Sequence, residues 1–141
     1  MVHAIEAFTS INSNNNPVSK MLSIEALKLL GSSIKTAVFD GHNINARSNM
    51  LLGSMLAGKA FANSPVAAVH ALAYPIGGLF NISHGLSNSL VLTSVMKFNS
   101  KNEETKKHYA HLAPYVFKNL DNSKNDEFLC NNFIDGLERL C

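Results

Sequence analysis

The sequence predicts an all-α fold of roughly six or seven helices in one domain spanning residues 1–141. Two observations carry this prediction. Apolar side chains recur at the three- to four-residue spacing of a helix face in most segments of the chain. No segment of useful length alternates apolar and polar residues as a half-buried strand would, and no internal repeat appears. A chain of 141 residues is also long enough to bury a sizeable core.

The composition narrows the class of protein. Hydrophobic residues make up 46% of the chain and charged residues 16%, which is typical of globular rather than disordered proteins. A net charge of +2 is too small to indicate binding to nucleic acid or to a membrane surface. Two cysteines, Cys130 and Cys141, are too few for a disulfide framework, so we expect free thiols and a cytoplasmic protein. The sequence assigns no role to either thiol.

The first half of the chain contains two clear helix signals. Residues 1–8 have helical propensity but begin without a capping residue, and residues 10–17 form a polar loop. Asn16 can cap the next helix, with Pro17 at its first position. We predict that this helix runs over 18–38 and buries one apolar stripe, made of Ile24, Leu27, Leu30, Ile34 and Val38.

The middle of the chain predicts two more helices. The segment 45–62 is apolar nearly all round, above all over 51–58, so we expect a helix that is buried on most sides. Ser64–Pro65 is a suitable start for a helix over 66–77. Pro75 and Gly77–Gly78 then predict a break in the chain.

Three helices are expected in the remaining residues. The helix over 84–98 should bury Leu86, Leu90, Val91 and Val95. A helix over 103–120 should bury Tyr109, Leu112, Val116 and Leu120, and a last one over 126–141 should bury Leu129, Phe133, Leu137 and Leu140. His108 and His111 fall beside the apolar stripe of their helix, among lysines, and we interpret them as surface residues.

Two histidines flank the predicted break and are candidates for metal ligation. A helix that ends at the break can direct His70 inward, and the loop then places His84 at the start of the next helix. Neutral imidazoles held by different elements are suitable ligands for a borderline cation. Spacing alone leaves the role open, since fourteen residues match no compact zinc template and a single histidine on an apolar face is usually a core residue. A ring at a helix N-terminus experiences a positive potential, which suits a neutral ligand.

The stretch that contains both histidines resembles the metal-binding signature of the iron-containing (group III) alcohol dehydrogenase family. That signature is His-x-x-x-[His/Tyr]-Pro-[Leu/Ile]-Gly, followed after a short loop by His-Gly. The residues that match it are His70, Tyr74, Pro75, Ile76, Gly77, His84 and Gly85. Residues 1–7 also match the second half of the family's Asp-Ala-[Leu/Met]-x-His-Ala-Ile-Glu-Ala segment, and residues 46–50 resemble its Ala-Arg-x-Asn-Met segment.

The resemblance implies a C-terminal helical metal-binding domain that is truncated at both ends. Its metal ligands would be His3, His70 and His84, and the family's aspartate ligand would fall two residues before Met1. Phe61 would lie at the substrate pocket.

Tyr74 occupies a position where some family members have a second histidine that is thought to assist proton movement. It lies one turn beyond His70, on the same helix face. Tyr74 could reach the substrate region, or it could only pack against its neighbours.

Members of this family are NAD(P)-dependent dehydrogenases of two domains. The resemblance implies a divalent metal, Fe²⁺ or alternatively Zn²⁺, that acts as a Lewis acid on a small alcohol or aldehyde substrate. It also implies that NAD(P) is held by an N-terminal α/β domain, and this chain contains no Gly-rich phosphate turn after a strand. We therefore expect that the isolated chain does not catalyse hydride transfer. We also expect a homo-oligomer, because apolar surface that the other domain would cover is left open.

The same residues raise two other functions. The chain could be a non-catalytic helical metal-binding or protein-interaction module derived from the same family. A zinc hydrolase is disfavoured because no carboxylate is placed as a general base. Glu6 lies near His3 in sequence but points about 60° away from it on a helix that turns about 100° per residue.

Overall fold

The computed structural model describes residues 1–65 and 67–141, and within these ranges the chain forms seven α-helices and no strand. The all-α prediction is therefore confirmed. The helices are α1 (Val2–Thr9), α2 (Pro17–Phe39), α3 (Ile44–Asn63), α4 (Ala68–Phe80), α5 (His84–Asn99), α6 (Glu103–Val116) and α7 (Asp126–Glu138). None of the described helices combines the length and the apolar character that crossing a membrane requires.

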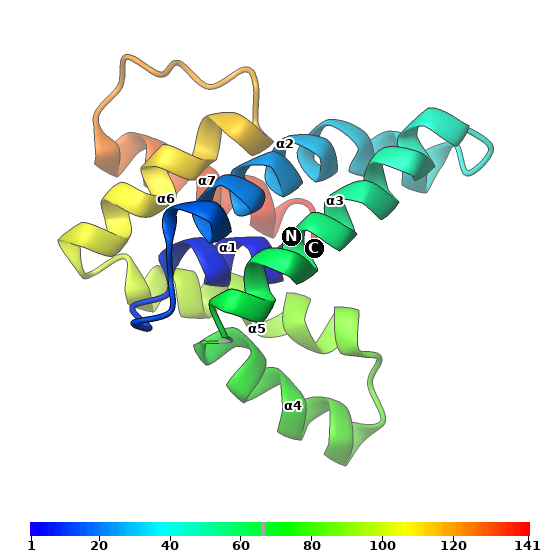
Figure 1. The fold of residues 1–141 in the computed structure, drawn as a ribbon, viewed down its shortest axis with the longest axis horizontal. Coiled ribbons are helices and arrows are strands. Elements are labelled where there is room, and N and C mark those ends of the chain that lie inside the picture. The colour runs from blue at the N-terminus through cyan, green and yellow to red at the C-terminus, as the bar shows by residue number, and fades with distance from the viewer. Residues whose placement is uncertain (66) are drawn as a thin grey trace.

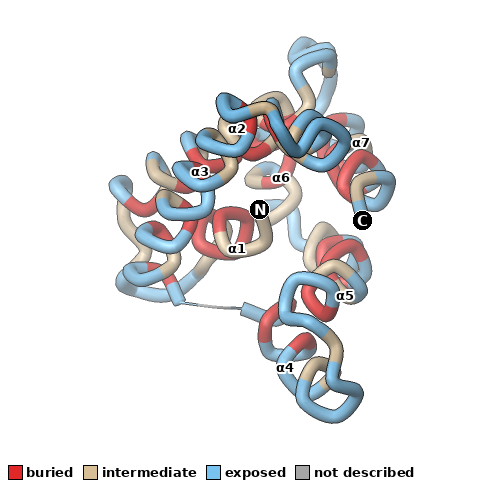
Figure 2. Tube along the Cα trace, turned by 90° about the vertical axis from the view of Figure 1, so that its right-hand side faces the viewer, coloured by how far each residue is buried: buried red, intermediate tan, exposed pale blue. Residues whose placement is uncertain are grey.

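The short helix α1 lies at the centre of this arrangement. It contacts α2, α3 and α6, while α2 pairs with α3, α6 with α7, and α4 with α5 (Figure 1). Residues 4–8 of α1 are all buried, which Figure 2 shows as a nearly continuous red segment. The α4–α5 hairpin extends away from the other helices in both views, and its contacts with them are mainly those of α5 with α7.

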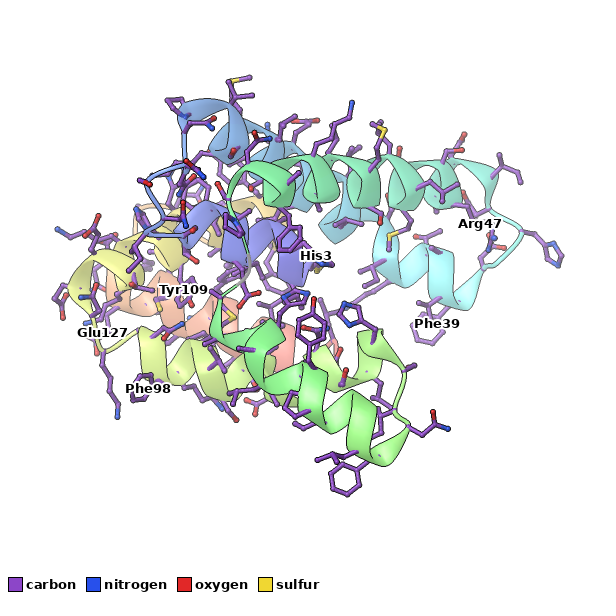
Figure 3. The ribbon with its side chains drawn as sticks, turned by 60° about the horizontal axis from the view of Figure 1, so that its bottom comes forward. His3, Phe39, Arg47, Phe98, Tyr109 and Glu127 are labelled. Atoms are coloured by element: carbon purple, nitrogen blue, oxygen red, sulfur yellow. The ribbon has the colours of Figure 1, made fainter. Side chains whose placement is uncertain are left out.

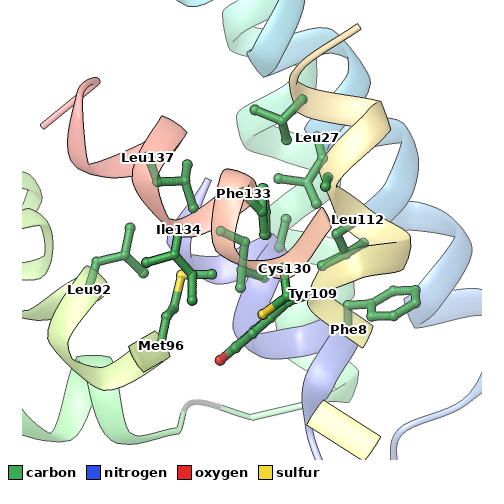
Figure 4. Close-up of a cluster of buried hydrophobic side chains, with 14 of the residues drawn as sticks. Phe8, Leu27, Leu92, Met96, Tyr109, Leu112, Cys130, Phe133, Ile134 and Leu137 are labelled. Carbon is green, nitrogen blue, oxygen red and sulfur yellow. The ribbon is translucent and has the colours of Figure 1, made fainter. Parts of the chain in front are cut away.

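The hydrophobic core lies between α1, α2, α5, α6 and α7. Phe133 of α7 is fully buried, and around it lie side chains from the other four helices, among them Leu27, Met96 and Leu112 (Figure 4). The buried stripes predicted for α6 and α7 contain Tyr109, Leu112, Val116, Leu129, Phe133 and Leu137, and all six are buried. Within these two helices, the spacing of apolar residues was sufficient to predict which residues are buried.

Asparagine side chains begin four of the helices. Asn16, Asn43, Asn102 and Asn125 each accept a hydrogen bond from the backbone N–H three residues further along the chain. Such a cap contributes roughly 1 kcal/mol by satisfying an N–H that has no partner within the helix. The predicted cap at Asn16, followed by Pro17, is confirmed.

The prediction that α3 is buried on most sides is wrong. Leu51 is 75% exposed, and Leu52 and Met55 are also exposed. The helix packs through a face of small residues that includes Gly53 and Ala57, where a Cβ on Gly53 would lie 2.8 Å from Leu30 Cγ. The small residues bring α3 close to α2, and nothing among the described residues covers the opposite face.

The inward face of α5 and the ends of two other stripes were also assigned incorrectly. Leu86 and Leu90 are exposed, whereas Leu92 and Met96 are buried with Val95 against the core. Other members of the predicted stripes are not fully buried either. Val38 is exposed near the end of α2, and Leu120 and Leu140 lie half-buried beyond the ends of α6 and α7. Ile24, Ile34 and Val91 are half-buried as well. Each face is decided by which neighbouring helix covers it, and the chain's own periodicity does not contain that information.

Helix α4 differs from the prediction at both ends. It begins at Ala68 and continues through Pro75 and Gly77–Gly78 to Phe80, so the expected break within 75–78 is wrong. The first residue of the predicted helix, Val66, lies outside the described residues. The helix ends at Asn81, whose φ of 54° is left-handed and whose N–H donates to the carbonyl of Gly77. Asparagine tolerates this conformation because its short polar side chain makes local hydrogen bonds.

Candidate metal centre

Three histidine rings converge where α1 meets the α4–α5 hairpin, at the place where Figure 3 labels His3. His3 comes from the first turn of α1, His70 from α4, and His84 is the first residue of α5. The ring centroids lie 4.4 Å apart for His3 and His70, 5.3 Å for His70 and His84, and 6.0 Å for His3 and His84. One ring nitrogen from each lies within 4.8 Å of the other two. The structure thus brings together the three histidines that the sequence singled out.

His70 is the most constrained of the three rings. It is 0% exposed, and its Nδ1 lies 2.5 Å from Oε2 of Glu6. A carboxylate accepts hydrogen bonds, so Nδ1 carries the proton and Nε2 keeps its lone pair. Nε2 is buried and has no hydrogen-bond partner among the described residues. A buried acceptor without a partner is unfavourable, and a cation placed between the three rings would satisfy it.

Glu6 is the residue of this site that sequence reasoning missed. It is only 4% exposed, and its other oxygen, Oε1, accepts the backbone N–H of Val69 at 2.8 Å. The expectation that Glu6 points away from His3 does not decide its role, because its partner His70 lies on another helix. The available signal was a charged residue inside the apolar run 4–8, since glutamate is rarely buried without a partner.

His84 is exposed, and the side chain of Asn88 lies against it. Nδ2 of Asn88 donates to the carbonyl of His84 at 2.8 Å and lies 3.3 Å from both ring nitrogens. Being equidistant from both nitrogens at this range, the amide lies over the ring face rather than opposite one nitrogen. The in-plane lone pair of His84 therefore stays available to a ligand.

His3 is held in its neutral form. Burial is the largest of the causes that lower the pKa of His3 from 6.5 to about 4. At neutral pH this ring carries no charge and offers a nitrogen lone pair, which is the state that a metal ligand requires.

Two aromatic residues flank the histidines. The ring of Phe61 meets His3 edge to face at 4.8 Å and lies 5.9 Å from His70. Tyr74 is 57% exposed and stacks on His84 at 5.9 Å, with 24° between the ring planes. Both residues predicted near the site are therefore beside the histidines, and Tyr74 also has one side in contact with solvent.

A cavity of about 250 Å³ opens beside the three rings. All three histidines line it, and its other walls are mostly apolar, with Ile34, Leu92, Leu137 and Leu140 among the lining residues.

The exposed Cys141 also lines this cavity, whereas Cys130 is buried in the core, where burial raises the pKa of its thiol to about 11. His108 and His111 lie elsewhere, with ring centroids 5.5 and 5.6 Å from that of Phe8, and of the two only His111 is exposed as predicted.

The donor set fits a divalent transition metal. Imidazole nitrogen is a ligand for both Zn²⁺ and Fe²⁺. Bonds of about 2.1 Å in a tetrahedral arrangement place ligand atoms roughly 3.4 Å apart. The three nitrogens lie within 4.8 Å of one another, so they would approach by up to about 1.4 Å to reach this separation. The observation that favours such an ion is Nε2 of His70, which is buried and has no hydrogen-bond partner within residues 1–65 and 67–141.

The whole chain matches the Fe-containing alcohol dehydrogenase family, C-terminal, over residues 1–141. Long-chain-alcohol dehydrogenase 1 of Geobacillus thermodenitrificans (strain NG80-2) is 47% identical over 98 residues, which are 70% of this chain and 24% of that protein. The 1,3-propanediol dehydrogenase of Citrobacter freundii is 36% identical over 121 residues, 86% of this chain and 30% of that protein.

Solved structures agree with this match. The crystal structure of 1,3-propanediol oxidoreductase superposes with a TM-score of 0.89 at 31% identity, covering 99% of this chain and 35% of that one. The alcohol dehydrogenase from Oenococcus oeni gives 0.89 at 32% identity, with the same coverage. The chain thus spans about a quarter to a third of the length of these relatives.

Proposed function

Since this chain belongs to the Fe-containing alcohol dehydrogenase family as its C-terminal domain, we propose that it is the metal-binding part of an NAD(P)-dependent alcohol dehydrogenase. The observation that carries the proposal is the convergence of three imidazoles around the buried Nε2 of His70, for which the part of the chain that the structure describes provides no hydrogen-bond partner. The proposed ligands are His3, His70 and His84. The metal is Fe²⁺, with Zn²⁺ as the alternative.

When bound, the ion supplies a Lewis acid that polarises the oxygen of the alcohol or aldehyde. The residues of the chain hold that position and shape its surroundings. Glu6 fixes the ring of His70, and Phe61 meets His3 edge to face and so excludes water from one side of the site. Tyr74 stacks on His84 and stays in contact with solvent, so its hydroxyl is the group we propose for exchanging protons with bulk water.

The substrate is a small alcohol or aldehyde, and the hydride acceptor is NAD(P). Relatives named for 1,3-propanediol and for long-chain alcohols support the substrate class. A dinucleotide needs a strand, a Gly-rich turn and a helix, and the described residues contain no strand. We therefore expect no turnover of NAD(P)H by the 141-residue chain alone. A cytoplasmic location stays a prediction.

A second candidate is a helical metal-binding or protein-interaction module without catalysis. It is favoured by one observation, the exposed apolar side chains along the α4–α5 hairpin, which are Leu72, Leu79, Phe80, Leu86 and Leu90. Exposed patches of this kind promote association, and they also support the proposed homo-oligomer. Light scattering tests the oligomer, and a monomer would contradict it.

Elemental analysis tests the metal proposal. The protein is purified without chelator and without an affinity column that carries metal, and the wild type should retain close to one equivalent of iron or zinc. A matched variant, His42→Ala, removes an exposed histidine in the turn between α2 and α3 and should retain the same amount. The variant His70→Ala should retain none. Equal metal contents in all three proteins would contradict the proposed ligands.

A further inference from the structure

We propose that Glu6 is the positioning residue of the metal centre, because its one carboxylate both sets the tautomer of His70 and begins the helix that carries it. The inference rests on the proposed function of the site as a metal centre. Helix α1 then contributes twice to the site. It carries the ligand His3 and, three residues further along, Glu6, whose carboxylate orients the ring of His70.

The first contact makes Glu6 the N-terminal cap of α4. The residue before this helix, Ala67, has no side chain that could cap it, although four of the other described helices have an asparagine at that position. The N–H of Val69, in the first turn, is one of the donors that a helix leaves without a partner. Oε1 of Glu6 accepts it at 2.8 Å across 63 residues of sequence. A negative charge at this end also interacts favourably with the helix dipole.

The second contact selects which nitrogen of His70 keeps its lone pair. Oε2 of Glu6 accepts Nδ1–H, and Nε2 therefore presents its lone pair at the site. The ring is fully buried, so a rotated ring would leave the carboxylate facing a carbon atom. Carboxylates that accept from a ligand histidine raise its basicity, and losing one typically weakens metal binding 10- to 100-fold. Glu6 is itself buried, and its carboxylate lies next to the ring of His70.

Both contacts need an acceptor, and this requirement makes Glu6→Gln an informative variant. Glutamine has nearly the same shape, but its amide provides one oxygen and one NH₂ group. If the oxygen caps Val69, the NH₂ group faces Nδ1 of His70 and forces the proton onto Nε2. If the oxygen instead accepts from His70, the NH₂ group opposes the N–H of Val69. Neither orientation preserves the arrangement seen with glutamate.

The experiment measures three quantities in the full chain: the dissociation constant for Zn²⁺ by competition with a chelator, the visible spectrum of the Co²⁺-loaded protein, and the melting temperature without metal. The control is Asn49→Ala, which removes a 3.1 Å hydrogen bond to Ser33 Oγ between α3 and α2; neither residue lines the cavity beside the three histidines. We expect Glu6→Gln to weaken Zn²⁺ binding about 10- to 100-fold and to change the Co²⁺ spectrum. The control should lower the melting temperature but leave the dissociation constant within threefold of the wild type.

A second measurement does not depend on the variant folding. Nitrogen-15 NMR of the metal-free wild type distinguishes the two neutral tautomers of His70, and we expect the Nδ1–H form. The Nε2–H form in the wild type, or Zn²⁺ binding by Glu6→Gln within threefold of the wild type, would overturn the inference. A wild type that binds no Zn²⁺ but shows the Nδ1–H form would instead overturn the proposed function and leave the positioning contact intact.

Discussion

Replacing His84 by alanine should separate metal binding from folding. His84 is exposed, and besides the two other histidines its ring contacts the amide of Asn88 and the ring of Tyr74. Removing such a side chain is expected to change the free energy of unfolding of the metal-free protein by no more than about 0.5 kcal/mol. The same change removes one of the three proposed ligands, so metal-dependent stabilisation should be lost while the fold persists.

The size of this loss follows from mass action. At a free metal concentration of about 1,000 times the dissociation constant, the wild type gains about 4.1 kcal/mol. If the loss of His84 weakens binding about 100-fold, the same metal concentration stabilises the variant by only about 1.4 kcal/mol. For a chain of this length, the difference of about 2.7 kcal/mol corresponds to roughly 8 °C in melting temperature.

Differential scanning calorimetry with and without Zn²⁺ measures both effects. The wild type and the control His42→Ala should show equal metal-dependent shifts, and His84→Ala should show a shift roughly 8 °C smaller, with its metal-free melting temperature nearly unchanged. The reasoning is refuted if Zn²⁺ stabilises His84→Ala as much as the wild type. It is also refuted if the variant loses several kcal/mol without metal, since His84 would then belong to the core.

Three further outcomes are expected. Phe133→Ala should lower the free energy of unfolding in urea by about 3–5 kcal/mol, because it empties a fully buried site; a loss below about 1 kcal/mol would contradict the core described above. A thiol reagent at pH 8 should label Cys141 rapidly and Cys130 only after unfolding, because Cys130 is buried and its pKa is raised to about 11; two fast thiols would be inconsistent with this. The pKa of His3 is lowered from 6.5 to about 4, so between these pH values the unfolded chain binds a proton that the folded chain does not. The free energy of unfolding of the metal-free protein should therefore decrease as the pH falls from 6.5 towards 4. The variant His3→Asn should reduce that decrease, and an unchanged pH dependence would argue against a neutral His3.

The sequence predicts the number and the type of helices well, because local signals determine them. Asn16 and Pro17 start α2 as expected, and the apolar spacing of α6 and α7 gives their buried faces correctly. The exposed faces of α3 and α5 were not predictable in this way. Leu51 and Leu90 are as apolar as the residues of the core, and they are exposed because no helix of the described chain covers them. The sequence of one helix does not show which of its faces a neighbouring helix will cover.

The three histidines of the site were identified by family resemblance, because their spacing alone matched no metal-binding template. Glu6 was missed for a related reason: its partners Val69 and His70 are 63 and 64 residues away, and no local pattern connects them. The helix that carries His70 was expected to end near Pro75, yet it continues to Phe80. Proline and glycine disfavour a helix without forbidding one, and α4 continues through Pro75, Gly77 and Gly78.

The most direct test of the account is a crystal structure of the protein grown with Zn²⁺ or Fe²⁺ and measured at the absorption edge of the metal. The account predicts one anomalous peak about 2.1 Å from a ring nitrogen of each of His3, His70 and His84, with Nε2 as the ligand atom of His70. An anomalous peak elsewhere in the molecule, or three histidines without an ion at saturating metal, would contradict it.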